Sequence, residues 1–220
     1  MTQRYASSST EMAAFTTADL RKNFLIETIF ETGQVHLVYS HYDRLVVGGA
    51  MPGPEPLELP CPEELKAEYF LERRELGILN VGGAGRVTVD GVVYQLGPQD
   101  CLYVGRGAQA VQFERDDERR PAKFYVLSAP AHCTHPTTRR PQAEATPVEM
   151  GNQSTANRRT IYKYIYAEGI QSCQLVMGLT QLRVGNVWNT MPAHTHDRRT
   201  EAYLYFNLPP DQRVLHLMGQ

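Results

Sequence analysis

The residues with the clearest capacity for chemistry are two histidines and a glutamate in the last part of the sequence. His194 and His196 are two positions apart, and Glu201 follows after the turn-like run Asp-Arg-Arg-Thr. On a β-strand, side chains two positions apart point to the same face and lie about 6–7 Å apart, so both imidazoles can bind one ion. An antiparallel return strand would bring the carboxylate beside them. Imidazole and carboxylate together suit Zn, Fe, Mn or Ni, and the pattern predicts a metal site.

Arginine and tyrosine side chains next to this motif are suited to binding a substrate. The planar guanidinium of Arg199, with that of Arg198, can bind a carboxylate through parallel hydrogen bonds. Tyr203 and Tyr205 share the strand face of Glu201 by parity. These tyrosines either line the pocket or pack as core aromatics, and the sequence leaves both interpretations open. We expect Arg199 and Tyr203 to bind substrate, and the sequence assigns no general base.

Other histidine, cysteine and glycine clusters give weaker signals. His132-Cys133-Thr-His135 could bind a metal, but the run lies in a proline-rich stretch without periodicity, so we expect solvated loop residues there. Gly82-Gly-Ala-Gly85 has neither a following helix nor a Lys-Ser/Thr pair, which predicts a hairpin turn and not a phosphate loop. Four widely spaced cysteines without a Cys-x-x-Cys pair predict free buried thiols and no cysteine-based zinc site. They are Cys61, Cys101, Cys133 and Cys173.

Composition places the chain among ordinary globular proteins. Its 220 residues are 42% hydrophobic and 21% charged, and 22 basic and 24 acidic side chains give a net charge of −2. This balance excludes a disordered acidic tail and a basic nucleic-acid-binding protein. Uncharged stretches such as Leu45–Pro54 are short and broken by Gly and Pro, so no membrane span is expected. The start lacks the apolar run of a secretory signal, which predicts a cytoplasmic protein.

Helix is expected only in the first part of the chain. The first fifteen residues are small and polar and predict a loose arm. The run from Thr17 to Phe30 is typical of a short helix, with Thr16 or Thr17 as its cap and Asp19 in the first turn. A second short helix is expected at Glu63–Glu68, after a proline-rich run.

Most of the remaining chain has strand patterns. Arg86–Asp90 alternates with period two, Asp90-Gly91 is a hairpin turn, and turns recur about every 8–12 residues, which predicts an all-β sandwich or barrel. Later strands are expected at Phe124–Leu127, Thr160–Tyr166, Cys173–Thr180, Gly185–Asn189, Glu201–Asn207 and Val214–Met218. We therefore divide the chain into an arm with a helix (1–34), a first β unit (35–130), a linker or crossover (131–156) and a second β unit (157–220).

These motifs resemble known proteins at two levels. His-x-His separated by four residues from Glu, with Gly185 ahead, resembles the first metal motif of the cupin barrels. Longer strings resemble the 5-keto-4-deoxyuronate isomerase family, from about residue 18 to Gln220. The strings are Tyr39-Ser-His-Tyr-Asp-Arg-Leu-Val-Val-Gly-Gly, Tyr69-Phe-Leu-Glu-Arg-Arg-Glu-Leu-Gly, Asn80-Val-Gly-Gly-Ala-Gly, Pro121-Ala-Lys-Phe-Tyr, Ala129-Pro-Ala-His, Asn157-Arg-Arg-Thr-Ile and Trp188-Asn-Thr-Met-Pro-Ala-His-Thr-His.

The resemblance implies two cupin units (double-stranded β-helix, or jelly roll), one zinc ion per subunit in the second unit, and a hexamer. It implies a ketol-isomerase that converts 5-dehydro-4-deoxy-D-glucuronate to 3-deoxy-D-glycero-2,5-hexodiulosonate in pectin and uronate degradation. Three of the family's four zinc ligands fall on His194, His196 and Glu201. Phe70 and Glu72 stand where the first unit would have a His-x-His pair, so that unit is expected to be metal-free.

The resemblance also places the fourth zinc ligand outside these residues. In the family it is a histidine in a later strand, beyond Gln220, and His216 is too early and in a different context. We therefore expect the second unit to be incomplete at its carboxyl end and to bind zinc weakly. A non-catalytic sugar-acid-binding cupin is the alternative function. A cupin dioxygenase with iron in a similar His-His-Glu set is a third, which the family strings disfavour.

Overall fold

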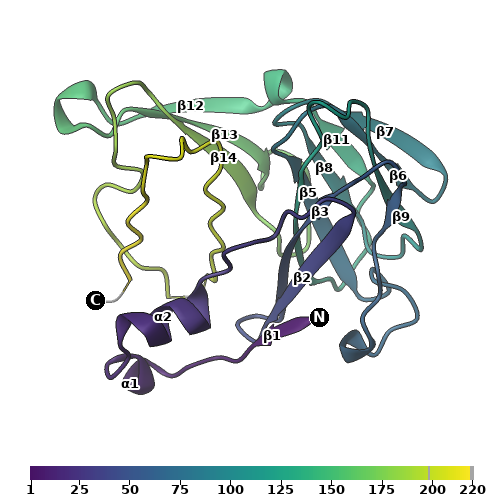
Figure 1. Cartoon of the computed structure of the whole chain (residues 1–220), viewed down its shortest axis with the longest axis horizontal. Coiled ribbons are helices and arrows are strands. Elements are labelled where there is room, and N and C mark those ends of the chain that lie inside the picture. Colours follow the sequence, from purple (N-terminus) through teal and green to yellow (C-terminus); the bar gives the residue numbers. More distant parts are fainter. Residues whose placement is uncertain (198, 219–220) are drawn as a thin grey trace.

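Three β-sheets make up almost all of the regular structure (Figure 1). The structure is a computed structural model that describes residues 1–197 and 199–218. One sheet has seven strands in the order β1-β2-β3-β10-β5-β8-β11, of which β1 is parallel to β2 and the others are antiparallel to their neighbours. Its strands are β1 (Thr2–Arg4), β2 (Gln34–Ser40), β3 (Leu45–Met51), β5 (Arg74–Asn80), β8 (Cys101–Val104), β10 (Phe124–Pro130) and β11 (Thr138–Arg140).

The other two sheets are antiparallel throughout. The four-stranded sheet has the order β4-β9-β6-β7 and contains β4 (Leu57–Glu58), β6 (Gly85–Val89), β7 (Val92–Leu96) and β9 (Val111–Arg115). The three-stranded sheet contains β12 (Thr146–Met150), β13 (Arg159–Ile165) and β14 (Met177–Leu182). The expected all-β, antiparallel fold is therefore confirmed.

The β6–β7 hairpin forms as its sequence predicts. Asp90 and Gly91 form the turn with positive φ angles of 47° and 83°, which is the conformation that an Asp-Gly pair favours between two strands. The Asp90 carboxylate also accepts the backbone N–H groups of Gln109 and Ala110, at 2.9 and 2.8 Å. This side chain therefore fixes the turn to the loop that precedes β9.

The seven-stranded sheet is covered on both faces. One face packs against the four-stranded sheet across a core that includes Leu76, Ile78, Phe113 and Phe124. The other face packs against the three-stranded sheet, and every residue of β5 is buried. The members of this second core are Ile29, Leu45, Leu79, Val81, Cys101, Tyr103, Tyr125, Leu127, Ala129, Ala145, Tyr164, Ile165, Ile170, Leu175, Met177 and Leu179. A central sheet buried on both faces ties the two parts of the chain together.

The helices are shorter than expected. Helix α2 (Thr17–Phe24) begins at the predicted Thr16, whose side chain accepts the Asp19 N–H in a capping box. It ends at Phe24 and does not reach Phe30, because Leu25 is already extended and Ile29 turns into the second core. The helix expected at Glu63–Glu68 is a single 3₁₀ turn, η1 (Glu63–Leu65). Its C-cap, Lys66, has a positive φ of 49° that no α-helix continues.

The prediction of a loose arm over the first fifteen residues is wrong. Residues 2–4 form β1, and Ser9–Met12 form helix α1, capped by Ser8. The Tyr42 hydroxyl accepts the N–H of Ser7 and donates to its carbonyl, at 2.8 and 3.0 Å. The arm is ordered because the edge of β2 offers it a hydrogen-bonding partner, which its own polar sequence does not reveal.

The segment expected to be a linker or crossover, 131–156, contributes strands. It supplies β11 to the seven-stranded sheet and β12 to the three-stranded sheet, together with the 3₁₀ turns η2 (Gln142–Glu144) and η3 (Gln153–Thr155). Its prolines lie at the ends and edges of these elements, where a missing N–H is tolerated. The polar composition reflects edge position and not absence of structure.

The strands expected in the last forty residues are not present among the described residues. The predicted strand at Thr160–Tyr166 is β13, but the one expected from Cys173 begins only at Met177, and residues 185–189, 201–207 and 214–218 have no strand assignment. The alternation of residues 201–206 is nevertheless real, because exposed and half-buried positions alternate along them. These residues have the side-chain pattern of a strand without a neighbouring ladder to complete it.

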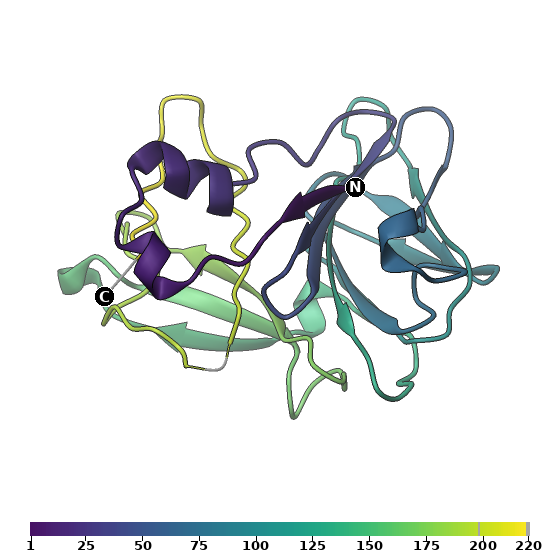
Figure 2. The ribbon, with the colours of Figure 1, turned by 90° about the horizontal axis from the view of Figure 1, so that it is seen from below.

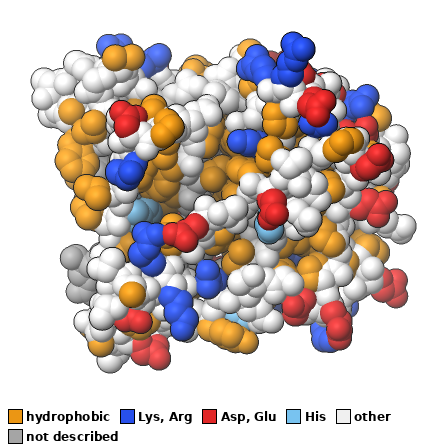
Figure 3. Space-filling model, viewed as in Figure 1, with side chains coloured by type: hydrophobic (Ala, Val, Ile, Leu, Met, Phe, Trp, Pro, Cys, Tyr) orange, Lys and Arg blue, Asp and Glu red, His pale blue; other side chains and the backbone are white. Residues whose placement is uncertain are grey.

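This carboxyl-terminal segment lies between the helices and the three-stranded sheet. Figures 1 and 2 both place the yellow ribbon there, beside α1 and α2. Most of the exposed large hydrophobic side chains also fall in residues 176–218, including Val184, Val187, Leu215 and Leu217. Hydrophobic side chains (orange) gather on this part of the face in Figure 3. In the described residues, no helix is long and apolar enough to cross a bilayer.

Candidate functional site

The segment that carries the predicted metal motif is attached to the three-stranded sheet through Asn186. This buried side chain accepts the Arg158 N–H at 2.7 Å and donates to the Gln153 side chain at 2.8 Å. The N–H of Val187 then donates to the Ala156 carbonyl at 3.0 Å. The motif therefore starts from a fixed point, although it lies outside the hydrogen-bonded ladder of the sheet.

Alternation along residues 201–206 sorts the side chains into two faces. Ala202, Leu204 and Phe206 are half-buried and pack against the second core. Glu201 and Tyr203 occupy the opposite, exposed face. The parity argument made from the sequence is therefore correct for this segment, and its inner face is what holds Glu201 in place.

Glu201 is the centre of a small polar cluster. Its Oε1 lies 3.4 Å from His196 Nε2 and 3.7 Å from Arg199 Nη1. Its Oε2 accepts a hydrogen bond of 2.7 Å from the Tyr203 hydroxyl. Partial burial and this hydrogen bond to the carboxylate raise the pKa of Tyr203 to about 12, so the phenol remains a donor across the neutral range. One carboxylate oxygen is thus held by the tyrosine while the other faces the imidazole.

His194 lies beside the His196–Glu201 pair, but its ring nitrogens do not converge with their ligand atoms. Its ring is edge-on to the His196 ring, with centroids 4.8 Å apart, and its Nδ1 is 2.9 Å from the Pro192 carbonyl. With the proton on Nδ1, the Nε2 atom is free to bind a metal. In the part of the chain that the structure describes, however, the three side chains do not bring one ligand atom each within 4.8 Å of one another. His194 must rotate to complete the set.

Zinc fits this donor set by its chemistry. Two imidazoles and a carboxylate are a common set of three ligands for a catalytic zinc ion, with a fourth position open to water or substrate. The Tyr203 hydroxyl orients Glu201, the role that outer hydrogen bonds play at metal sites. His194 is exposed, and exposed side chains change rotamer rapidly, so its present orientation does not obstruct binding.

Two further aromatic residues complete the surroundings. Tyr205 stacks on Tyr203 with ring centroids 6.3 Å apart, and its hydroxyl is 2.8 Å from His216 Nδ1. His216 also lies edge-on to Tyr203, with centroids 5.5 Å apart. The sequence excludes His216 as the fourth zinc ligand because it comes too early in the chain. The structure places it against Tyr203 and Tyr205, and these three rings form the aromatic wall of the cluster. Both tyrosines are exposed and do not pack in the core, and their role in lining a pocket stays a prediction.

The guanidinium proposed to bind substrate is engaged with the site itself. Arg199 is paired with Glu201, and the neighbouring Thr200 hydroxyl donates to the Asp43 carboxylate in the β2–β3 turn. The other arginine of the pair, Arg198, lies outside the described residues. A carboxylate ligand would therefore have to compete with Glu201 for Arg199 or bind its remaining N–H groups.

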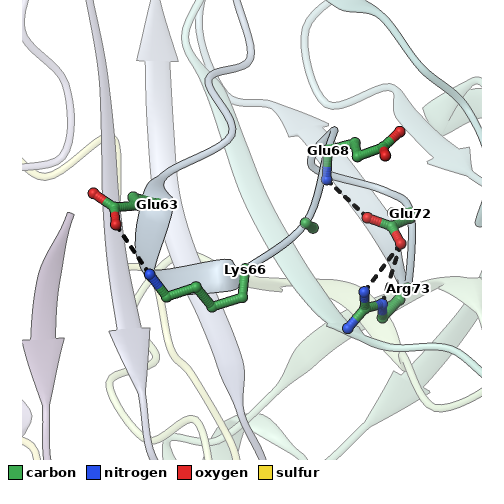
Figure 4. A pocket seen from close by; sticks show the side chains of 6 residues that line it. Glu63, Lys66, Glu68, Glu72 and Arg73 are labelled. Carbon is green, nitrogen blue, oxygen red and sulfur yellow. Dashed lines mark hydrogen bonds and ion pairs between the residues drawn. The ribbon is translucent and has the colours of Figure 1, made fainter.

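The corresponding positions of the first unit are occupied by other interactions. Phe70 is buried in the first core, and Glu72 accepts the Glu68 N–H at 2.8 Å and pairs with Arg73 at 3.1 Å. Glu72 and Arg73 border a shallow pocket of about 440 Å³ that also has a Lys66–Glu63 pair at its rim (Figure 4). Two of its three carboxylates are paired with the two cations that line it, and no histidine is among its lining residues. That the first unit binds no metal stays a prediction.

A second group of potential metal ligands was missed by sequence reasoning. His132, Cys133 and Cys173 each place one ligand atom so that all three atoms lie within 4.8 Å of one another. The sequence signal of His132-Cys133-Thr-His135 was noticed, but Cys173 is 40 residues away and no local spacing connects it. All four cysteines are free, as expected, but the prediction that they are buried is correct only for Cys101, because Cys61 and Cys173 are half-buried and Cys133 is exposed.

A sandwich of antiparallel sheets combined with a His-x-His and glutamate motif defines a protein of the cupin class. The chain belongs to the KduI/IolB family, whose model matches residues 24–216. It is 52% identical over 217 residues to a 4-deoxy-L-threo-5-hexosulose-uronate ketol-isomerase from Shouchella clausii, covering 99% of this chain and 79% of that protein. It is 53% identical over 220 residues to the protein of the same name from Halalkalibacterium halodurans, covering 100% and 80%.

Solved structures overlap the chain only in part. An IolB-like protein from Salmonella typhimurium shares 18% identity with a TM-score of 0.41, covering 54% of this chain and 43% of that one. A cupin protein from Bacteroides fragilis shares 14% identity with a TM-score of 0.34, covering 53% and 92%.

Proposed function

We propose that this chain is a zinc-dependent ketol-isomerase that converts 5-dehydro-4-deoxy-D-glucuronate to 3-deoxy-D-glycero-2,5-hexodiulosonate. The observation that carries the proposal is identity of about half the residues, over the whole chain, to proteins named for ketol isomerisation of a hexosulose uronate. The cluster around Glu201 supports it, because that cluster has the side chains that such a reaction needs.

The reaction interconverts an α-hydroxy aldehyde and an α-hydroxy ketone, which moves a proton between adjacent carbons through an enediol. Bound zinc would supply Lewis-acid polarisation of a substrate oxygen. His194, His196 and Glu201 would hold the ion, and the Tyr203 hydroxyl would keep Glu201 Oε1 turned toward His196. The guanidinium of Arg199 would bind the substrate carboxylate beside the ion. Tyr205 and His216 would form the aromatic wall.

The proposal includes the remaining features expected from the sequence. A homo-oligomer, a hexamer in the family, agrees with the exposed apolar side chains of residues 176–218, because contiguous exposed apolar surface marks interaction sites. A cytoplasmic location agrees with four free thiols. We also keep the proposed boundaries at residues 34, 130 and 156, which separate the amino-terminal arm, the first β unit, the connecting segment and the second β unit.

The test is turnover with the metal content measured on the same sample. The zinc-loaded chain is expected to convert the keto-uronate, with the ketol product followed by NMR. His196→Asn should lose both zinc and turnover, whereas His36→Asn, which changes a histidine of β2, should keep both. Equal turnover of zinc-loaded wild type and His196→Asn would contradict the proposal.

A sugar-acid-binding cupin without catalysis is the second candidate. The position of His194, outside the His196–Glu201 pair, is the observation that favours it. Tight binding of the keto-uronate by calorimetry, without turnover at saturating zinc, would establish this alternative. Oxygen uptake by a chain that contains iron would instead indicate a cupin dioxygenase.

A further inference from the structure

We propose that Cys133, Cys173 and His132, whose ligand atoms all lie within 4.8 Å of one another, form a second metal site that takes Zn²⁺ or another thiophilic divalent ion, with His135 next to it. The two sulfur atoms are 3.3 Å apart, and Cys133 Sγ is 3.4 Å from His135 Nε2. Zinc bond lengths at tetrahedral angles give about 3.8 Å between two sulfur ligands and about 3.5 Å between sulfur and nitrogen. The sulfur–nitrogen distance is close to this spacing, the sulfur–sulfur distance is about half an ångström shorter, and a ligand atom of His132 lies within 4.8 Å of both sulfurs.

The loop that carries Cys173 is fixed by a buried carboxylate. Glu75, fully buried on β5, accepts the backbone N–H groups of Cys173, Gln174 and Leu175 at 2.7, 2.7 and 2.8 Å. The Tyr103 hydroxyl donates to the same carboxylate at 2.8 Å. Charge-assisted hydrogen bonds of this kind are roughly twice as strong as neutral ones, so Cys173 is held in position before any ion binds.

The loop that carries Cys133 is fixed independently. Arg106 donates to the carbonyls of Ala131 and His132, both at 3.4 Å, and its own carbonyl accepts the Thr134 hydroxyl at 3.2 Å. The backbone also approaches β8 closely, since a Cβ on Gly105 would lie 1.9 Å from the His135 carbonyl oxygen. Two loops that are 40 residues apart in sequence thus present their thiols to one point.

The ligand types and the surroundings suit a structural site. Two thiolates and a neutral imidazole are three good zinc ligands and leave a fourth position for water or for the neighbouring His135, and the two negative sulfurs balance the charge of the ion. A hollow of about 150 Å³ borders Cys173, and Cys133 and His132 are exposed, so an ion can enter without opening the core. Binding would cross-link the β10–β11 loop to the loop before β14. The ion would therefore connect the seven-stranded sheet to the three-stranded sheet.

The test uses the full chain, kept reduced with a phosphine, and Co²⁺ as a spectroscopic probe. Thiolate ligation is expected to produce a sulfur-to-cobalt charge-transfer band. Cys133→Ser and Cys173→Ser should each weaken Co²⁺ binding by more than about tenfold and reduce the band. Cys61→Ser is the matched control and should leave the band unchanged. The double variant His194→Asn/His196→Asn should also keep it, which separates this site from the proposed catalytic one.

A second measurement does not depend on the folding of the variants. In the wild-type chain, Zn²⁺ should slow alkylation of Cys133 and Cys173 at least tenfold relative to Cys61, as read by peptide mass spectrometry. Absence of the charge-transfer band, or a band that survives in both cysteine variants, would overturn the proposal. Equal alkylation of all three thiols with and without Zn²⁺ would overturn it as well.

Discussion

The Tyr203 hydroxyl donates a 2.7 Å hydrogen bond to Glu201 Oε2, and this leaves Oε1 facing His196 Nε2 at 3.4 Å. Packing of Ala202 and Leu204 on the second core holds the backbone beside Glu201, and the tyrosine hydroxyl fixes which carboxylate oxygen faces the imidazole. The tyrosine in turn is fixed by its stack on Tyr205. The orientation of one proposed ligand therefore depends on a side chain that does not contact the ion.

Tyr203→Phe should weaken zinc binding by about 10–100-fold, the usual effect of removing an orienting hydrogen bond. The ring and its stacking remain, so the fold should be unchanged. Affinity is measured by competition with a chromogenic chelator. Tyr205→Phe is the control, because it removes a hydroxyl that contacts His216 and not Glu201. Equal zinc affinity of wild type and Tyr203→Phe would show that Glu201 is oriented by other contacts.

Glu72→Gln should leave the metal content of the chain unchanged. The Glu72 carboxylate is already used by the Glu68 N–H and by Arg73, and neighbouring Phe70 is buried in the first core. Hydrogen bonding to Glu68 and Arg73 also lowers the pKa of Glu72. Elemental analysis of the folded variant checks this. Loss of one ion per chain would mean that the first unit binds metal after all.

Tyr125 and Tyr164 make a matched pair for measuring what a buried hydroxyl contributes. The Tyr164 hydroxyl donates to the Gln99 carbonyl at 2.6 Å, whereas the buried Tyr125 hydroxyl has no partner in the described structure. Tyr164→Phe should lower the free energy of unfolding by about 0.5–1.5 kcal/mol, and Tyr125→Phe should leave it unchanged or raise it. Urea unfolding of both variants is the measurement, and an equal loss in both would contradict the assignment.

Stability should fall as the pH rises above about 10, the ordinary tyrosine pKa in the unfolded chain. Burial raises the pKa values of Tyr103, Tyr125 and Tyr164, and Tyr103 is raised further by its hydrogen bond to Glu75. Below pH 10 these phenols are protonated in both states. Above it the unfolded chain releases protons that the folded chain retains, which favours unfolding. Urea midpoints at pH 8 and pH 10.5 check this, and Tyr125→Phe should show a smaller decrease.

The sequence predicts the local features of this protein well where a short-range physical reason exists. The Asp90-Gly91 turn and the Thr16 cap depend on residues within a few positions of each other, and both form as expected. The two faces of residues 201–206 follow from strand parity in the same way. Sequence reasoning fails where a distant partner decides the outcome. The arm became β1 because β2 offered an edge, and residues 201–207 lack a strand assignment because no ladder accompanies them.

The two candidate sites also differ in whether their residues are close together in the sequence. His194, His196, Arg199 and Glu201 lie within eight positions and could be grouped by spacing alone. The sequence could not predict the contact between Cys173 and Cys133, because it depends on how the three-stranded sheet packs on the seven-stranded sheet. Glu75 gave no signal either, since a single glutamate in an apolar strand does not show which backbone groups it will accept.

The last prediction concerns that glutamate. Glu75→Gln should lower the free energy of unfolding by about 2–4 kcal/mol, because a neutral amide replaces a carboxylate that accepts four hydrogen bonds, and bonds to charged groups contribute about 1.5–3 kcal/mol each. Tyr103→Phe, which removes only one of the four, should cost less. In Glu75→Gln the amide protons of residues 173–175 should also exchange faster with solvent, while those of β6 and β7 should be unaffected under native conditions. Hydrogen exchange by mass spectrometry measures both regions in the wild type and in Glu75→Gln. If the exchange rates of residues 173–175 are the same in both proteins, the loop before β14 is held without the carboxylate.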